Sequence, residues 1–240
     1  MATTAQSLRE QVAWACRILA LEGYADLTLG HVSARAPGDD LVHIKRKGVA
    51  LDEVDADDVI ELDLRHDEVP LTPDMHLEAV LHTEVYRARP DVGAVVHGHP
   101  PFATAFAATG ATLEMLTHDS VLFSDGVAVF EETPDLITEV GQGQAVAEAL
   151  GDLRALVLRN HGVLVVGKSV PWAVLTALTL ERAIRLQSIA GTLGTLRPIA
   201  PDRARDMVAD KYQDRFVDEY WSAWTRRLER LDAAPSGRNV

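Results

Sequence analysis

The sequence contains two histidines, His97 and His99, whose spacing could bind a metal ion. Only Gly98 separates them, and they follow the apolar run at residues 92–96, which is typical of a buried strand. Residues two apart on a strand point to the same side, so both imidazoles are expected to converge, with Gly98 leaving room beside them. Two converging imidazoles suit Zn²⁺, Mn²⁺ or Fe²⁺. The alternative is two strand-end histidines with ordinary hydrogen bonds.

A third histidine, His161, lies in the polar stretch Arg-Asn-His-Gly at residues 159–162, between two runs rich in leucine and valine. A plain hairpin turn does not require an imidazole, although a turn with a capped carbonyl stays open as the alternative. Three histidines with an open fourth position are typical of a catalytic metal site rather than a structural one. We therefore expect His161 to join the other two.

Carboxylates occur just before this predicted strand. Glu78 and His82 lie four residues apart, and on a helix they would share one face. A carboxylate turned toward the metal could act as a base or as a fourth ligand, whereas the plainer alternative is a solvated helix face. We assign Glu84, elsewhere on the same predicted helix, to that solvated face.

The elements that must position these residues follow an α/β pattern. Helices are predicted at residues 7–22, 73–89, 103–108, 133–150, 169–195 and 203–231, and strands at residues 27–33, 41–44, 59–64, 92–97, 127–130, 156–158 and 163–166. Ser7 can cap the first helix and Gly23 can end it, while Pro73 and Pro134 suit first helical turns. Hairpin connections predict a largely antiparallel sheet with helices on its faces. We expect one domain at residues 1–232 and a loose tail at residues 233–240.

Composition excludes several classes of protein. Of 240 residues, 47% are hydrophobic and 25% are charged, which is ordinary for a globular domain and excludes disorder. The formal net charge of −13 argues against binding to nucleic acid or to anionic membranes. The sequence shows neither a targeting segment nor a long apolar run, and its single cysteine, Cys16, permits no internal disulfide. We expect a soluble, cytoplasmic protein.

Several motifs together resemble the class II aldolase/adducin family. They are Leu-Gly-His-Val-Ser-Ala-Arg at residues 29–35, Glu78, the segment at residues 86–99 and the tetrapeptide at residues 159–162. The resemblance spans about residues 8–190. It implies a three-layer α/β/α sandwich with a mostly antiparallel central sheet, usually a homotetramer with active sites between subunits. It also implies one divalent ion per subunit, Zn²⁺ or Mn²⁺, held by His97, His99 and His161, with Glu78 as the acid/base.

The sequence departs from sugar-phosphate aldolases of that family where they hold phosphate. They have Gly-Asn in place of Gly30-His31, a hydroxyl residue in place of Lys47, and two serines in place of His76 and Leu77. The resemblance therefore implies a rebuilt pocket for a small anionic substrate, whose carboxylate or phenolate oxygens suit basic and imidazole groups. The candidate substrate-binding residues are His31, Ser33, Lys45, Lys47 and His76. A solvated loop is the alternative for residues 45–47.

Two further catalytic candidates lie downstream. Counting without gaps from His99 places His118 where fuculose-phosphate aldolases carry a catalytic tyrosine. Near the chain end, several aromatics fall at helical spacing, and in this family C-terminal residues often close a neighbouring subunit's site. We take Tyr220 as the candidate among Tyr212, Phe216, Tyr220, Trp221 and Trp224. Packing within the subunit is the alternative.

These features predict a metal-dependent lyase that breaks a carbon–carbon bond. The Gly-His-Val-Ser motif and the missing serine pair are similar to family members that decarboxylate hydroxylated aromatic acids, so we favour that reaction. Aldol cleavage of a sugar or sugar phosphate, epimerisation and dehydration stay open. A non-catalytic adducin-like scaffold would be expected to lack the metal histidines. An amidohydrolase barrel is disfavoured because His97 lies too far along the chain.

Overall fold

A mixed seven-stranded sheet forms the middle of the protein in a computed structural model that describes residues 6–24, 26–66 and 72–233. The strands are β1 (His31–Arg35), β2 (Leu41–Lys45), β3 (Val59–Asp63), β4 (Ala94–Gly98), β5 (Ala128–Phe130), β6 (Ala155–Leu158) and β7 (Gly162–Gly167). Their order is β3-β2-β1-β4-β7-β6-β5. Within the described residues, β5 and β6 form a parallel pair and the other neighbours are antiparallel.

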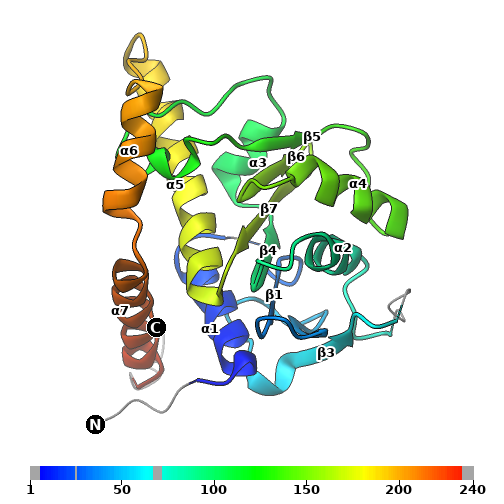
Figure 1. Cartoon of the computed structure of the whole chain (residues 1–240). Helices are drawn as coiled ribbons and strands as arrows, with labels where there is room; N and C mark the ends of the chain where they lie inside the picture. The colour runs from blue at the N-terminus through cyan, green and yellow to red at the C-terminus, as the bar shows by residue number, and fades with distance from the viewer. Residues whose placement is uncertain (1–5, 25, 67–71, 234–240) are drawn as a thin grey trace, which may run out of the picture.

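Helices cover both faces of this sheet (Figure 1). One face packs against α1 (Leu8–Leu21), α3 (Pro101–Ala107) and α5 (Val170–Leu193), and the other against α2 (Val80–Ala88) and α4 (Val140–Leu150). The core is accordingly divided into two hydrophobic clusters, one on each side of the strands. The predicted three-layer α/β/α class is confirmed, with a sheet that is mixed rather than purely antiparallel.

Alternation along the two central strands decides which side chains face the α2 layer. On β4, Val96 belongs to the cluster beneath α1 and α5, whereas Val95 belongs to the cluster beneath α2 and α4. His97 continues the face of Val95. On the adjacent strand β1, His31 pairs in register with His97, so their side chains lie next to each other. The sheet thus brings imidazoles from segments far apart in sequence to one face.

The first helix has the predicted ends. The Ser7 hydroxyl accepts a hydrogen bond from the Glu10 amide, and the Glu10 side chain accepts from the Ser7 amide, which completes a capping box. At the other end Gly23 has φ of +102°, a conformation that favours glycine. Cys16 lies on the inward face of this helix and is fully buried.

Four predicted boundaries are wrong. The strand predicted at residues 27–33 begins at His31, because Leu27 has φ of +49° within a turn. The helices predicted from Pro73 and Pro134 begin at Val80 and Val140, after non-helical segments. The helix predicted at residues 203–231 is two helices, α6 (Pro201–Lys211) and α7 (Asp214–Ala233).

Glu84 was also predicted wrongly, as part of a solvated face. It is 3% exposed, forms an ion pair with Arg87 and accepts hydrogen bonds from Thr83 and Gln144. The reason is the packing of α4 over α2, where a Cβ on Gly143 would lie only 2.8 Å from Cγ of Glu84. The two helices approach too closely at this point for water to reach the carboxylate.

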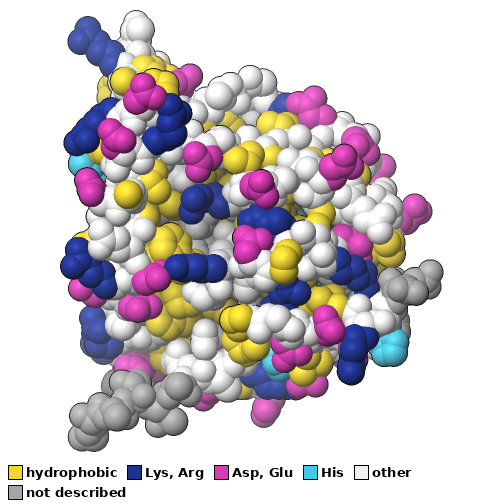
Figure 2. Space-filling view, viewed as in Figure 1, with side chains coloured by type: hydrophobic (Ala, Val, Ile, Leu, Met, Phe, Trp, Pro, Cys, Tyr) yellow, Lys and Arg dark blue, Asp and Glu magenta, His cyan; other side chains and the backbone are white. Residues whose placement is uncertain are grey.

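The two C-terminal helices run alongside α5 at one edge of the molecule (Figure 1). The Tyr212 hydroxyl donates to the carbonyl of Asp119 at 3.0 Å, which fixes the break between α6 and α7. Ala233 ends α7, and the rest of the predicted tail lies outside the described residues. Among the helices of the described residues, none is long and apolar enough to span a membrane. The face drawn in Figure 2 carries acidic and basic side chains interspersed.

Candidate metal centre

Three histidines meet where β4 ends and the β6–β7 turn begins. Ligand atoms of His97, His99 and His161 all lie within 4.8 Å of one another. The three ring centroids are separated by 4.9, 5.1 and 5.2 Å, which is close to an equilateral triangle. The structure thus brings the three predicted metal ligands together.

The turn that carries His161 is built for close approach. Asn160 adopts φ of +57°, the left-handed conformation that asparagine tolerates better than most residues. A Cβ on the following Gly162 would lie 2.7 Å from both the carbonyl oxygen of Gly98 and Cδ2 of His99. Only glycine lets β7 approach β4 this closely, and that approach is what places His161 over His99.

The donor set fits a divalent cation. Both ring nitrogens of His97 and both of His161 are buried, and among the described residues they have no hydrogen-bond partner. Leaving a buried polar atom unpaired costs about 1–3 kcal/mol, so four such nitrogens in one place need an explanation. Imidazole nitrogens are the ligands that Zn²⁺ and similar ions prefer, and one ion would satisfy one nitrogen on each ring.

Glu78 faces the same point from the opposite side. Its Oε2 lies 3.6 Å from Nε2 of His97, and its Oε1 lies 3.6 Å from Nε2 of His161. The backbone amide of Ile137 donates to Oε1 at 2.9 Å and fixes the carboxylate. Burial by itself would raise the pKa of Glu78, but the attraction of the nearby imidazoles of His161 and His97 outweighs burial and lowers it.

Glu78 and His82 do not share a helix face, contrary to the sequence-based prediction. Glu78 lies in the turns before α2, whereas His82 lies within the helix. The two side chains point to different partners: Glu78 faces the histidine triangle, and His82 binds His31. The error follows from the wrong start of the helix.

Sequence reasoning missed Asp26, which orients His99. Its Oδ2 accepts from the backbone amide of His99 at 2.7 Å, and its Oδ1 lies 3.1 Å from Nδ1 of the same residue. This leaves Nε2 of His99 for the metal, the carboxylate–histidine arrangement common around metal ions. Burial would raise the pKa of Asp26, but the bonds with His99 prevail and lower it. The available signal was Gly30 and Gly98, where a Cβ would lie 2.7 and 2.6 Å from Oδ2.

The predicted substrate-binding residues separate into two groups. His31 and His76 are buried at the centre, with ring centroids 4.3 Å apart, and His31 also lies 4.9 Å from His97. Lys45 is fully buried, and its Nζ contacts the carbonyls of Thr28 and Arg46 and Nε2 of His76. These three contacts use the three N–H donors of the Lys45 ammonium group. Its positive charge therefore lies behind His76 as seen from the histidine triangle.

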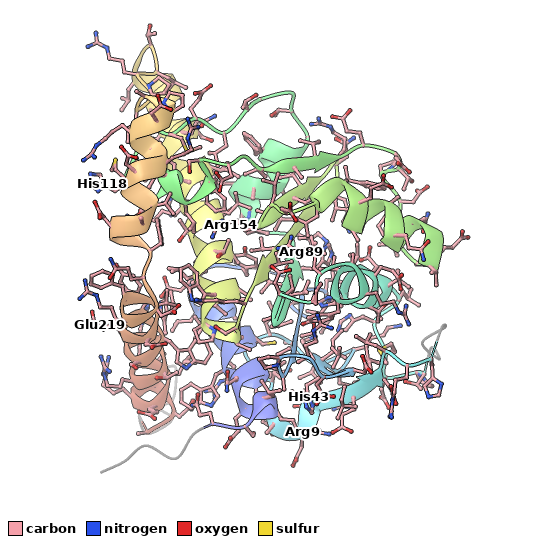
Figure 3. The ribbon with its side chains drawn as sticks, in the orientation of Figure 1. Arg9, His43, Arg89, His118, Arg154 and Glu219 are labelled. Carbon is pink, nitrogen blue, oxygen red and sulfur yellow. The ribbon has the colours of Figure 1, made fainter. Side chains whose placement is uncertain are left out.

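The remaining predicted residues are placed elsewhere in the subunit. Ser33 is buried beneath His82 and does not touch the histidine triangle, and Lys47 is exposed. His118 lies exposed at the outer edge beside α6 (Figure 3). Tyr220 is 47% exposed on α7 and lines a groove of about 710 Å³ that includes none of the three histidines. Neither His118 nor Tyr220 contacts the centre within the part of the chain that the structure describes.

The chain is similar to known proteins in both sequence and fold. The model of the class II aldolase and adducin N-terminal domain matches residues 10–188. A 3,4-dihydroxyphthalate decarboxylase from Arthrobacter keyseri is 30% identical over 238 residues, covering 94% of both chains. A solved aldolase II superfamily protein from Pseudomonas syringae superposes with a TM-score of 0.82 at 28% identity, covering 93% of this chain and 92% of the other.

A solved L-fuculose 1-phosphate aldolase from Glaciozyma antarctica superposes almost as well. Its TM-score is 0.81 at 26% identity, and the match covers 96% of this chain and 94% of the other. The family model covers well over half of the chain, and the matched range includes His97, His99 and His161. The chain belongs to the class II aldolase and adducin family.

Proposed function

We propose that the protein is a divalent-metal-dependent lyase that breaks a carbon–carbon bond. The observation that carries this proposal is the set of buried nitrogens on His97 and His161 that have no hydrogen-bond partner among the described residues and that face a buried carboxylate. A purely structural polar cluster would satisfy these atoms internally. We propose Zn²⁺ or Mn²⁺ as the ion, held by His97, His99 and His161.

The chemistry that such an ion supplies is electrostatic stabilisation of negative charge on substrate oxygens. The residues of the chain would move the proton. In decarboxylation of an ortho-hydroxy aromatic acid, Glu78 would take the hydroxyl proton and return it to the ring carbon that loses CO₂. The carbon–carbon bond then breaks, CO₂ leaves, and the product departs as a phenolate that takes a proton from water. The amide of Ile137 holds the carboxylate in place throughout.

We favour hydroxylated aromatic carboxylates as the substrate class. Leu77 is 45% exposed beside Glu78 and offers no hydrogen-bond donor, which suits an aromatic ring better than a phosphate. His31 and His76 supply imidazoles instead of hydroxyls, and the cation of Lys45 lies behind them. The relative that this chain matches over 94% of its length is a decarboxylase of such a compound.

Aldol cleavage of a sugar phosphate is the second candidate. The similarity to a fuculose 1-phosphate aldolase, with a TM-score of 0.81, is the observation that favours it. Epimerisation would use the same bond cleavage. A non-catalytic scaffold role is disfavoured, because it would not require three histidines with open nitrogens around one carboxylate.

The test is a two-substrate comparison with protein that has been stripped of metal and reloaded with Zn²⁺ or Mn²⁺. A panel of ortho-hydroxy aromatic acids is followed by CO₂ release, and ketose 1-phosphates by aldehyde release. We expect CO₂ release that is lost on chelation and restored by metal. If a ketose 1-phosphate is cleaved above about 10⁴ M⁻¹s⁻¹ in kcat/KM while no acid loses CO₂, the aldolase candidate replaces the decarboxylase. Full activity in chelator would overturn both.

We also propose that residues 1–232 act as one domain and that the protein is a homotetramer. The support is the exposed position of His118 and Tyr220, which the family resemblance places at active sites but which lie away from the centre of their own subunit. A neighbouring subunit would bring them there.

A further inference from the structure

A buried chain of four polar side chains leads from the metal centre into the layer between the sheet and α2. Nδ1 of His31 lies 2.6 Å from Nε2 of His82, and Nδ1 of His82 lies 2.6 Å from Oγ of Ser33. The Ser33 hydroxyl in turn lies 2.9 Å from the hydroxyl of Tyr86. None of the four is more than 2% exposed, so the bonds form out of contact with water.

The two elements that carry this chain have matching periods. His31 and Ser33 lie two apart on β1 and point to the same face of the sheet. His82 and Tyr86 lie four apart on α2 and share the helix face that covers it. Along the hydrogen-bonded series, the side chains therefore come alternately from β1 and from α2.

Counting protons fixes the direction of these bonds. At the end away from the metal centre, Tyr86 and Ser33 each bring one hydroxyl proton. Among the described residues, the Tyr86 proton has only Ser33 Oγ as an acceptor within reach, whereas the Ser33 proton can reach Tyr86 Oη or His82 Nδ1. Tyr86 must donate to Ser33, and Ser33 must donate to His82. The reverse direction would leave one buried hydroxyl proton without an acceptor, which is costly.

The same reasoning assigns the ring protons of the two histidines. Since Nδ1 of His82 accepts, its proton lies on Nε2 and is donated to Nδ1 of His31. His31 therefore carries its own proton on Nε2, the nitrogen left to face the centre. Burial lowers the pKa of His82 well below its usual value, in keeping with a neutral ring that can make only one donation.

We infer that Ser33 and His82 are positioning residues that hold His31 as its Nε2–H tautomer, aimed at an oxygen of the bound substrate. A ring nitrogen of His31 lies within 4.8 Å of ligand atoms on Glu78 and His97, which by distance alone would also suit a fourth metal ligand. A protonated Nε2 cannot ligate a metal, so the hydrogen-bond chain makes His31 a donor instead. Such a donor stabilises charge that develops on a substrate oxygen.

The substrate-facing role of His31 rests on the proposed function, but its tautomer does not. The tautomer is read from ¹⁵N shifts of histidine-labelled, Zn²⁺-loaded protein by solid-state NMR, with His31 and His82 assigned from the signals lost in His31→Gln and His82→Gln. We expect a bare Nδ1 and a protonated Nε2 on both rings. A protonated Nδ1 on His31 overturns the inference, whether or not the protein is a lyase.

Two substitutions in the hydrogen-bonded series distinguish a positioning role from a general effect on stability. Ser33→Ala removes the donor to His82, so we expect His31 to populate both tautomers. Tyr86→Phe removes a hydroxyl from the same chain but leaves Ser33 free to donate, so we expect the wild-type tautomer there. An unchanged tautomer in Ser33→Ala contradicts the positioning role. If that variant does not fold, the wild-type spectrum still decides the direction of the bonds.

A double-mutant cycle gives the kinetic test once a substrate is known. Ser33→Ala should lower kcat/KM at least about 10-fold in the wild-type background and change it less than about twofold in the His31→Gln background. Equal losses in both backgrounds would show that Ser33 acts without His31 and would overturn the assignment. Absence of any lyase activity would remove this arm only, because the NMR result is independent of turnover.

Discussion

Two carboxylates act on the histidine triangle from opposite sides, Glu78 within it and Asp26 behind it. Glu78 lies 3.6 Å from His97 and from His161, where a substrate proton could be taken and returned. The Asp26 carboxylate binds His99, through both its backbone amide and its ring. Glu78 is therefore placed for proton transfer and Asp26 for orienting His99. Substitution of Glu78 should mainly lower turnover, whereas substitution of Asp26 should mainly weaken metal binding.

Asp26→Asn should weaken metal binding. Asp26 accepts one hydrogen bond on each oxygen, whereas an asparagine offers one oxygen and an NH₂ group that cannot accept. Loss of such a support typically costs about 10- to 100-fold in metal affinity. Competition with a chromophoric chelator measures it, with the exposed Asp52→Asn as the matched control. Unchanged affinity would show that His99 needs no orienting partner.

Glu78→Gln should retain the fold and the metal but lose at least about 10²-fold in turnover, the usual scale for an acid/base group. The amide keeps the shape of the side chain, and its oxygen can still accept from the Ile137 amide, so stability should change little. Turnover, bound metal and thermal unfolding are measured together, with the exposed Glu148→Gln as control. Wild-type turnover would assign the proton transfer to another group.

At the scale of elements, sequence reasoning was right where the signal is local and wrong where two loops meet. The pattern of two same-side histidines at the end of an apolar run required only the period of a strand, and β4 has it. Pro73 and Pro134 are both good helix-start signals, yet the segments that follow them directly are not helical. Those segments meet where the Ile137 amide binds Glu78. The tertiary contact outweighs the local preference, and no pattern within either segment reveals the other.

The failure to predict the role of Asp26 has the same physical cause. Asp26 and His99 are distant in sequence, and an aspartate in a turn has many ordinary uses. Gly30 and Gly98 are the trace that the contact leaves in the sequence, because a side chain at either would collide with the Asp26 carboxylate. The two glycines point to this contact only when β1 and β4 are known to be neighbouring strands. Glu84 was misjudged for a similar reason, since its burial depends on α4.

Gly98→Ala should damage the site through this contact. The new Cβ would lie 2.6 Å from Oδ2 of Asp26 and 3.2 Å from Cδ1 of Tyr24, so the carboxylate must move away from His99. We expect weaker metal binding together with a lower melting temperature.

Gly141→Ala is the matched comparison. Gly141 lies in α4, and its added Cβ would meet nothing within 4 Å. Alanine is favoured over glycine inside a helix by about 0.5–1 kcal/mol, so this variant should be slightly more stable with unchanged metal affinity. Equal behaviour of the two variants in metal titration and thermal unfolding would show that the close approach of Gly98 to the Asp26 carboxylate does not matter for the site.

At the scale of the whole molecule, the positions of His118 and Tyr220 predict that active sites are shared between subunits. One subunit holds His97, His99 and His161 together, and within the described residues neither His118 nor Tyr220 touches them there. Mixing inactive His161→Ala with a Tyr220→Ala variant should therefore restore activity in mixed oligomers, which can contain one intact composite site. Each variant refolded alone should stay inactive.

Two results would contradict a shared site. Full activity of a species that sediments as a monomer would show that one subunit suffices. Wild-type activity of Tyr220→Ala and of His118→Ala would remove both residues from the site and would assign the aromatic side chains of α7 to packing within the subunit.

The burial of Cys16 has a practical consequence for such experiments. It is the only cysteine of the chain, it is fully buried on the inward face of α1, and burial raises the pKa of its thiol to about 12. Thiol reagents act on the thiolate, so the wild-type protein should be silent toward maleimides without any background mutation. A cysteine placed at Leu193, which is 83% exposed, would then be the single labelled position of each subunit. Subunits carrying donor and acceptor dyes could report their own exchange by energy transfer, in an otherwise native chain.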